Sequence, residues 1–452
     1  MWIHQWRRIP GLVAAVAFVL ANAVGAAAET TYRVPGDFET IGAAMDTSVA
    51  GDTILVGPGT YKESLLFTEK TGNGIILKST DGSAKTTIAY GEEENQNEAV
   101  ITFQRCNNST QFIGFSIDGR GLARRGILTN SDSKPVLQDI QVDGCEYAIA
   151  VHRGSRPWVR DAVLRNSRTA GLFISGGSVD VKDTSVLGSE KFGVYVGNAT
   201  EAVLLRNVIV DDNGQVGVQA AESEISFLGG KVTNNGDTGL ILNETTGTLS
   251  GLTVTGHTNI GIVMEIFSGT VSDCRIADNE FGAVSAIEGS PRIIRCVFEN
   301  NSAYHLGIEG DAQPLIGGSL ANGNLFLGEP DFRVQHTSTQ DVIATYNYWD
   351  LPCSPKQFFQ ISGGGKLKRR PWAAGNLLRS FEDCTKSRQY NKWFRNDKLN
   401  PDGTHIKGKY LPGEDPNAVA EPAASDPDDY NDEYDDGGSD APVETSRSDS
   451  ES

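Results

Sequence analysis

Gly171-Leu172-Phe173-Ile174 and Gly193-Val194-Tyr195-Val196 are two copies of one short phrase, in which a glycine is followed by apolar residues. The phrase recurs through residues 126–322. Its copies start 22, 23, 22, 24, 22, 22 and 21 residues apart, at Gly126, Ala148, Gly171, Gly193, Gly217, Gly239, Gly261 and Gly282. A period this constant indicates a repeat array rather than a conventional globular core.

Each period contains three short apolar runs separated by small residues, Asn or Gly, such as residues 171–174, 179–181 and 184–186. β-branched residues and Gly are frequent and no long helical periodicity is present, so the runs predict strands. A leucine-rich repeat is a poor fit, because it needs a run of leucines and an Asn or Cys at a fixed place. The pattern predicts an all-β parallel β-helix with coils of about 22 residues.

Stacked coils place each residue about 4.8 Å above its equivalent in the previous coil, so like residues form ladders. We expect one buried apolar ladder at Ile127, Ile149, Leu172, Val194, Val218, Leu240 and Ile262. A second row, at the turn after the second strand, contains Asp139, Asp161, Asp183, Asn207 and Asp273. Three stacked carboxylates could bridge a calcium ion. We favour a structural role, because Asp and Asn suit turns with a left-handed backbone.

Residues 1–28 predict a secretory signal peptide. Arg7 and Arg8 precede an apolar run, and Ala26-Ala27-Ala28 ends it with small residues. The run is too short and too rich in Ala to predict a transmembrane helix, and no second candidate follows. We therefore expect a secreted or periplasmic protein with no membrane span after signal cleavage.

The next segment resembles the start of secreted proteins with the pectate-lyase-like right-handed β-helix. The resemblance is carried by residues 31–45 and by Gly51-Asp52-Thr53-Ile54, which leads into Gly59-Thr60-Tyr61. In such proteins a short helix, here Phe38 to Thr47, caps the first coil. Asn347-Tyr348-Trp349 and Pro371-Trp372 resemble the closing segment of bacterial repeat proteins of this type. The resemblance implies one right-handed β-helix domain over residues 29–375.

Two segments of opposite charge follow. Residues 376–411 are basic, whereas residues 412–452 hold fourteen Asp and Glu against Arg447 alone, or 13 of the 19 net negative charges. A segment so poor in apolar residues cannot bury enough surface to fold, so we predict a disordered acidic tail. We interpret it as a solubilising end, with a calcium ion or a cationic partner as the alternative.

Six cysteines are present, and an exported protein can form disulfides. Cys274 and Cys296 occupy equivalent places in adjacent coils, where either a disulfide or two buried thiols would fit. Cys353 and Cys384 could join the C-terminal segment to the end of the β-helix. We predict no partner for Cys106 or Cys145.

Alternation places Leu128, Ala150, Phe173, Tyr195, Gln219, Ile241 and Val263 outward on the first strand of each coil. Phe173 and Tyr195 lie one coil apart, with His152 and Arg153 beside them. Aromatic rings stack on sugars, and His and Arg can pair with uronate carboxylates. We predict a substrate-binding surface at these four residues; the alternative is that they are ordinary exposed or loop-covered side chains.

Two function classes stay open. The motifs of polygalacturonases, pectin methylesterases and mannuronan epimerases are absent, which favours a protein that binds a polysaccharide or a surface protein without catalysis. The alternative is a lyase, epimerase or hydrolase of an acidic glycan. We identify no catalytic residue, no metal ligands and no cofactor, with calcium left open, and we expect no nucleic-acid partner.

Overall fold

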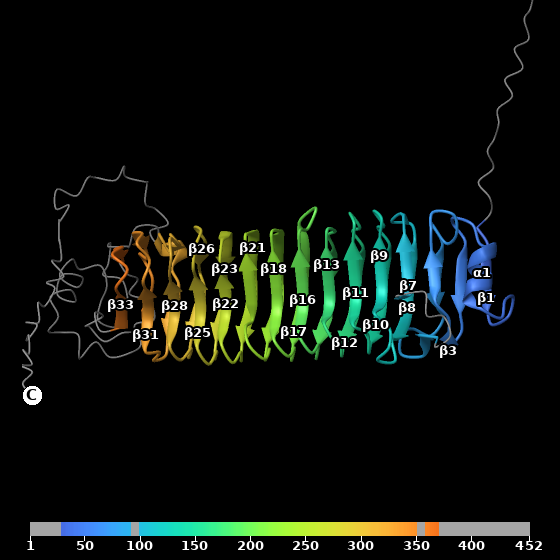
Figure 1. Cartoon of the computed structure of the whole chain (residues 1–452), viewed down its shortest axis with the longest axis horizontal. Helices are drawn as coiled ribbons and strands as arrows, with labels where there is room; N and C mark the ends of the chain where they lie inside the picture. The colour runs from blue at the N-terminus through green and yellow to red at the C-terminus, as the bar shows by residue number, and fades with distance from the viewer. Residues whose placement is uncertain (1–28, 92–98, 350–357, 370–452) are drawn as a thin grey trace, which may run out of the picture.

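The computed structural model describes residues 29–91, 99–349 and 358–369. Within them the chain winds into coils stacked along one long axis (Figure 1). The predicted signal peptide, the basic segment and the acidic tail lie outside the described residues, as do Cys353, Cys384 and Pro371-Trp372. No described helix is long and apolar enough to cross a membrane.

Every strand pairs in parallel with the equivalent strand of the next coil, which gives two sheets. The first sheet has 13 strands: β4 (Leu65–Phe67), β7 (Ala99–Gln104), β9 (Arg125–Asn130), β11 (Tyr147–His152), β13 (Ala170–Ser175), β16 (Phe192–Gly197), β18 (Val216–Ala221), β20 (Leu240–Asn243), β22 (Ile260–Met264), β25 (Gly282–Ala286), β28 (Tyr304–Ile308), β31 (Phe332–His336) and β33 (Phe359–Ile361).

The second sheet wraps the other sides of the coils and has 21 strands. They are β1 (Thr31–Val34), β2 (Thr53–Val56), β3 (Gly59–Lys62), β5 (Ile76–Ser79), β6 (Thr86–Ala89), β8 (Gln111–Asp118), β10 (Val136–Asp143), β12 (Trp158–Arg165), β14 (Asp180–Lys182), β15 (Ser185–Leu187), β17 (Val203–Asp211), β19 (Glu224–Thr233), β21 (Thr245–Thr255), β23 (Phe267–Ser272), β24 (Arg275–Ala277), β26 (Arg292–Ile294), β27 (Val297–Glu299), β29 (Leu315–Ile316), β30 (Leu325–Leu327), β32 (Val342–Ile343) and β34 (Leu367–Lys368). A 3₁₀ turn, η1, covers Leu320–Asn322.

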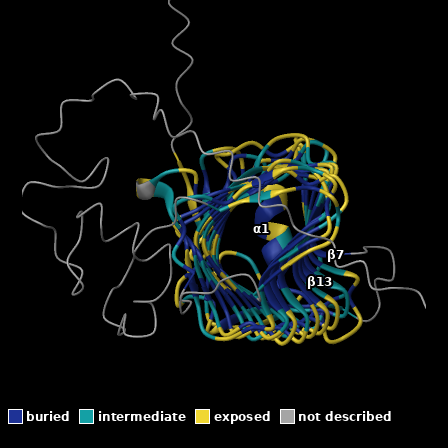
Figure 2. Ribbon diagram, turned by 90° about the vertical axis from the view of Figure 1, so that its left-hand side faces the viewer, coloured by how far each residue is buried: buried dark blue, intermediate teal, exposed yellow. Residues whose placement is uncertain are grey.

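The predicted all-β parallel β-helix and its apolar ladder are confirmed. Ile149 pairs with Ile127 and Leu172, and the register continues coil by coil to Ile262. All seven ladder residues are buried in the single core that the coils enclose (Figure 2). Burying apolar surface along the whole axis supplies the main stabilising free energy of such a solenoid.

The row of Asp and Asn residues has the predicted left-handed backbone, but the predicted turn after the second strand is wrong for three of them. Asp139, Asp161 and Asn207 lie at bends within β10, β12 and β17. Asp139, Asp161, Asp183 and Asn207 have φ between 50° and 52°, and Asp273 has φ 57°. This left-handed conformation disfavours most side chains other than Asn, Asp and Gly, which explains the recurrence. Their carboxylates have protein partners: Asp183 Oδ1 accepts a hydrogen bond from Asn207 Nδ2 at 2.7 Å, and Arg295 donates to both oxygens of Asp273 at 2.7 Å.

A second ladder, of polar side chains inside the solenoid, was not predicted. The backbone N–H of Asn213 donates to Asn235 Oδ1 at 3.1 Å, the N–H of Asn235 reaches His257 Nδ1 at 3.2 Å, and the N–H of His257 reaches Asn279 Oδ1 at 3.3 Å. All four side chains are buried. The ladder therefore satisfies buried N–H groups at a corner where no strand can do so.

This ladder explains why the repeated phrase begins with glycine. A Cβ atom added to Gly217 would lie 2.7 Å from Asn235 Nδ2, and one added to Gly239 would lie 2.6 Å from His257 Nε2. The carbonyl oxygen of the next coil is as close or closer, at 2.7 Å for Gly217 and 2.4 Å for Gly239. Real Cβ contacts are longer, so any larger residue would displace both the ladder side chain and the neighbouring backbone. The glycine makes room for the amide or imidazole that closes the same coil.

Helix α1 covers Ile41–Thr47, three residues shorter at its start than the predicted helix from Phe38. Glu63 fixes its N-terminus by accepting hydrogen bonds from the N–H groups of Ile41 at 2.9 Å and Gly42 at 2.8 Å. Ile41, Ala44 and Met45 belong to the core. Figures 1 and 2 place α1 at the N-terminal end, within the outline of the coils. That it seals the core there stays a prediction.

Four cysteines lie in the described residues, and all are buried and free: Cys106, Cys145, Cys274 and Cys296. Of the two alternatives left open for Cys274 and Cys296, the structure has the stacked thiols. Each Sγ approaches a backbone carbonyl, of Ser272 at 3.2 Å and of Ile294 at 3.3 Å respectively.

Candidate functional site

The outer face of the first sheet carries the residues that alternation placed there. Ala150 pairs with Leu128 and Phe173, Phe173 with Tyr195, and Tyr195 with Gln219. Each of these residues thus pairs with the residue at the equivalent outward position of the next coil. Side chains on neighbouring coils therefore come into contact. The predicted one-coil stacking of Phe173 and Tyr195 is present in the structure.

Four aromatic side chains form a continuous surface on β11, β13 and β16, which we call the aromatic patch: Tyr147, Phe173, Phe192 and Tyr195. The ring centroids of Phe173 and Tyr195 are 5.2 Å apart and the rings are within 10° of parallel. Tyr147 lies 4.7 Å from Phe173, and Phe192 lies 5.7 Å from Tyr195. All four are only partly buried, so a ligand can reach them.

Small neighbours allow the rings to lie against the sheet. Ala150 occupies the outward position beside Phe173, and a Cβ added to Gly197 would lie 3.3 Å from the ring of Tyr195. A larger residue at 197 would therefore lift the Tyr195 ring away from the strand.

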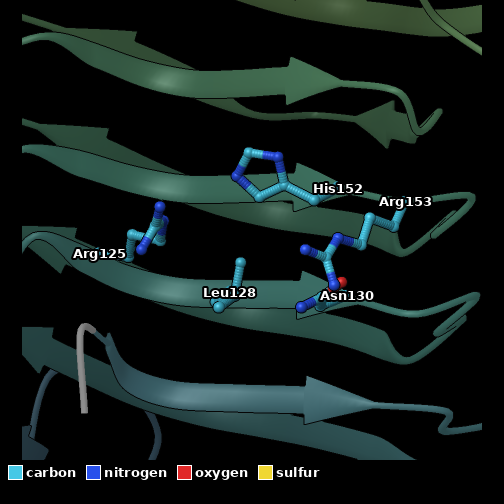
Figure 3. Close-up of a pocket in the computed structure, with 5 residues that line it drawn as sticks. All are labelled: Arg125, Leu128, Asn130, His152 and Arg153. Carbon is cyan, nitrogen blue, oxygen red and sulfur yellow. The ribbon is translucent and has the colours of Figure 1, made fainter. Parts of the chain in front are cut away.

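A pocket of about 250 Å³ opens beside the patch (Figure 3). It is lined by residues of β9 and β11 and by the turn after β11, namely Arg125, Leu128, Asn130, His152 and Arg153. The imidazole of His152 lies 5.6 Å from the ring of Phe173, which makes the pocket and the patch one surface. Apart from Leu128, every residue that lines the pocket carries a hydrogen-bond donor.

The guanidinium groups of Arg125 and Arg153 favour an anion in the pocket. Burial, followed by the positive charge of Arg125, lowers the pKa of His152, so its imidazole is neutral at pH 7. Its Nε2 atom is buried and has no hydrogen-bond partner among the described residues. A buried polar atom without a partner is costly, and a ligand oxygen at this place would satisfy it.

Tyr147, at the other end of the patch, is also perturbed. Burial raises the pKa of its hydroxyl, and the neighbouring Glu146 raises it further. Tyr147 is therefore a neutral phenol at pH 7. The rings of Tyr147 and His152 both contact Phe173, from one strand, β11.

The structure brings the four predicted site residues together: His152, Arg153, Phe173 and Tyr195. Their role in binding stays a prediction. Tyr147, Phe192 and Arg125 were missed. Each directly precedes the first residue of the repeated phrase. Strict alternation from Leu128, Ala150 and Tyr195 would have turned all three inward, but two successive buried residues at the start of each phrase reverse the pattern.

Comparison with known proteins agrees with this architecture. A family model described as "Right handed beta helix region" matches residues 170–326, and one described as "Periplasmic copper-binding protein (NosD)" matches residues 45–228. A search of curated proteins finds no match.

Solved structures are similar at low identity. The A-module of mannuronan C-5 epimerase AlgE4 from Azotobacter vinelandii is 14% identical, with a TM-score of 0.51 over 70% of this chain and 97% of that chain. The AlgE6 A-module from the same organism is 14% identical, with a TM-score of 0.44 over 74% and 93%. Pectate lyase Pel9A is 12% identical, with a TM-score of 0.36 over 85% and 89%.

The family model, the AlgE4 likeness and the parallel register of both sheets point to the same architecture. The chain folds as a right-handed parallel β-helix, the fold that it shares with the AlgE4 A-module.

Proposed function

We propose that this protein is exported and binds an acidic polysaccharide across the aromatic patch and the adjoining pocket. The observation that carries the proposal is the junction of the two: partly exposed rings on successive coils meet a pocket that contains two arginines and an unpartnered imidazole nitrogen. Sugar rings stack on aromatic faces, while guanidinium groups pair with carboxylates.

The similar proteins support this class of ligand and an exported location. The epimerase and the lyase bear the names of enzymes that act on acidic polysaccharides, and the NosD model is described as periplasmic. That model is also described as copper-binding. Within residues 29–91, 99–349 and 358–369, no three His, Cys, Asp or Glu side chains are placed to hold one metal ion, so the described residues do not fit a copper site.

Removing both central rings is expected to weaken binding markedly. Each stacking ring contributes about 0.5 to 1.5 kcal/mol, so Phe173→Ala combined with Tyr195→Ala should cost about 1 to 3 kcal/mol, or about 5- to 150-fold in Kd. Both side chains point outward, so folding should be preserved. Calorimetry with uronate-containing polymers measures the affinity, and thermal melting checks the fold.

The matched control is Phe281→Ala, which removes an exposed ring far along the solenoid, just before β25. Its affinity should equal that of the wild type. Equal affinities of the double variant and the wild type would contradict the proposal.

A second candidate function, cleavage of the bound glycan, is favoured by the pairing of titratable groups around Phe173. A neutral His152 can accept the proton from the carbon beside a uronate carboxylate. The phenol of Tyr147 can give a proton to the departing glycosidic oxygen as the carbon–oxygen bond breaks and a carbon–carbon double bond forms.

This lyase chemistry has a direct test. The unsaturated product absorbs ultraviolet light, so incubation with uronate polymers should give rising absorbance, and His152→Gln should reduce the rate by about 10²- to 10⁴-fold, as expected for loss of a general base. If the wild type binds the polymer but the absorbance does not rise, the lyase function is excluded and glycan binding without catalysis is supported.

A further inference from the structure

The corner that follows the first-sheet strands carries opposite charges at its two ends. In five consecutive coils, after β18, β20, β22, β25 and β28, this corner holds a glutamate: Glu222, Glu244, Glu265, Glu288 and Glu309. None of these carboxylates takes part in an ion pair with a described residue. Glu222, Glu244 and Glu288 share one register position, and Glu265 and Glu309 lie one position before it. Adjacent coils are about 4.8 Å apart, so neighbouring carboxylates of the row repel one another.

Toward the N-terminus the same corner carries Arg105, Lys134 and Arg153, together with the acidic residues Glu69 and Asp132. Arg105 follows β7 and approaches Glu69 at 4.0 Å, and Arg153 follows β11 with no ion pair to a described residue. Arg125 and the unpartnered Nε2 of His152 lie beside them in the pocket. Lys134 is exposed in the turn after β9.

The sequence beyond Arg369 has the complementary order of charge. Residues 376–411 contain eight Lys and Arg against four Asp and Glu, a net charge of +4, and residues 412–452 have a net charge of −13. The described chain leaves at Arg369, whose guanidinium lies 4.5 Å from the ring centroid of Phe359 in β33. This is the end of the solenoid that is nearer to the glutamates.

The lengths are compatible. Nine strand spacings separate β33 from β11, or about 43 Å. The 42 residues from 370 to 411 can span up to about 140 Å when extended. The acidic residues can therefore reach the pocket while the basic segment lies over the glutamates.

We propose that residues 376–452 lie back along this corner, with the basic segment on the five glutamates and the acidic tail over the Arg125–His152–Arg153 pocket. The tail then occupies the anion site until a stronger polyanion displaces it. Only this competition rests on the proposed function; the docking itself does not.

Zero-length carbodiimide cross-linking of the full chain, read by mass spectrometry, tests the docking. We expect links from Lys386, Lys392 or Lys398 to Glu222, Glu244 or Glu288, and from Lys134 to tail carboxylates. Both sets should be lost in 1 M salt, where the screening length is about 3 Å. The experiment requires no glycan, so it tests the docking of residues 376–452 independently of glycan binding.

Charge reversal supplies the matched control. Glu222→Lys with Glu244→Lys and Glu288→Lys should abolish links to the basic segment, whereas Glu190→Lys with Glu280→Lys, at exposed positions on another corner, should preserve them. Isotope-labelled and unlabelled chains are mixed to identify links between molecules. Links only between molecules, or links that do not depend on salt, would overturn the proposal, and so would the absence of both sets.

Discussion

Between pH 6.5 and pH 4.5 the protein is expected to lose about 2 kcal/mol of stability through His305 alone. Burial, helped by the charge of Arg333, lowers the pKa of this imidazole to about 3 from its ordinary 6.5. As the pH falls, the unfolded chain takes up a proton that the folded chain does not, so stability falls from pH 6.5 down to about pH 3. At about pH 3 and below, the shifted pKa of His305 lowers the free energy of unfolding by about 5 kcal/mol in total.

The geometry supports this direction. His305 Nε2 lies 2.9 Å from the carbonyl of Leu327, and its Nδ1 lies 3.4 Å from Asn301 Nδ2, which can only donate. Protonation would turn Nδ1 into a donor that points at the N–H group of Asn301, which disfavours the charged imidazole. Urea unfolding of the wild type and of His305→Gln at several pH values measures the difference, because the other histidines are common to both. Parallel stability curves for the two proteins would contradict the prediction.

Asn235→Ala is expected to lower the free energy of unfolding by about 1 to 3 kcal/mol. The Oδ1 atom of Asn235 accepts from the N–H of Asn213 at 3.1 Å and from Asn213 Nδ2 at 2.9 Å, all in the buried interior. Alanine would leave the backbone N–H of Asn213 without a partner, whereas Asn213 Nδ2 would keep the carbonyl of Asp211 at 3.1 Å. One buried unsatisfied group costs about 1 to 3 kcal/mol.

Asn243→Ala is the control for this prediction, because Asn243 is a partly exposed asparagine at the end of β20. It should change stability by less than about 0.5 kcal/mol. Both variants can be compared by urea unfolding at pH 7. If Asn235→Ala were as mild as the control, the interior ladder would contribute little to stability.

The fold was predictable because its signals are periodic. The 22-residue phrase placed Ile127, Ile149 and Leu172 in one buried ladder, and the Asp row correctly indicated a left-handed backbone. The polar ladder was not found, because Asn213 and Asn235 look like ordinary turn residues in the sequence. Only the path of the backbone shows that these amides turn inward.

The candidate site was predictable in part for a similar reason. Alternation gave the outward positions of Phe173 and Tyr195, since it needs only the register of one strand. It could not give the pocket, which depends on how far the side chains of Arg125 and Arg153 extend around His152. Nor could it give the burial of His152 Nε2, which results from packing across coils.

The contact between each glycine and the ladder side chain of its own coil has a consequence for sequence evolution. Where the phrase begins with Ala148 instead of glycine, the equivalent corner holds Ser167, a smaller residue than asparagine. The constraint runs in one direction, because Gly171 is kept opposite the small Ser189. Among related chains a residue larger than glycine should therefore be tolerated at the first site only where the corner residue is small. Drift in this solenoid would then be governed by pairs of positions 18 to 20 residues apart, as in Gly217 with Asn235 and Gly193 with Asn213, rather than by single sites.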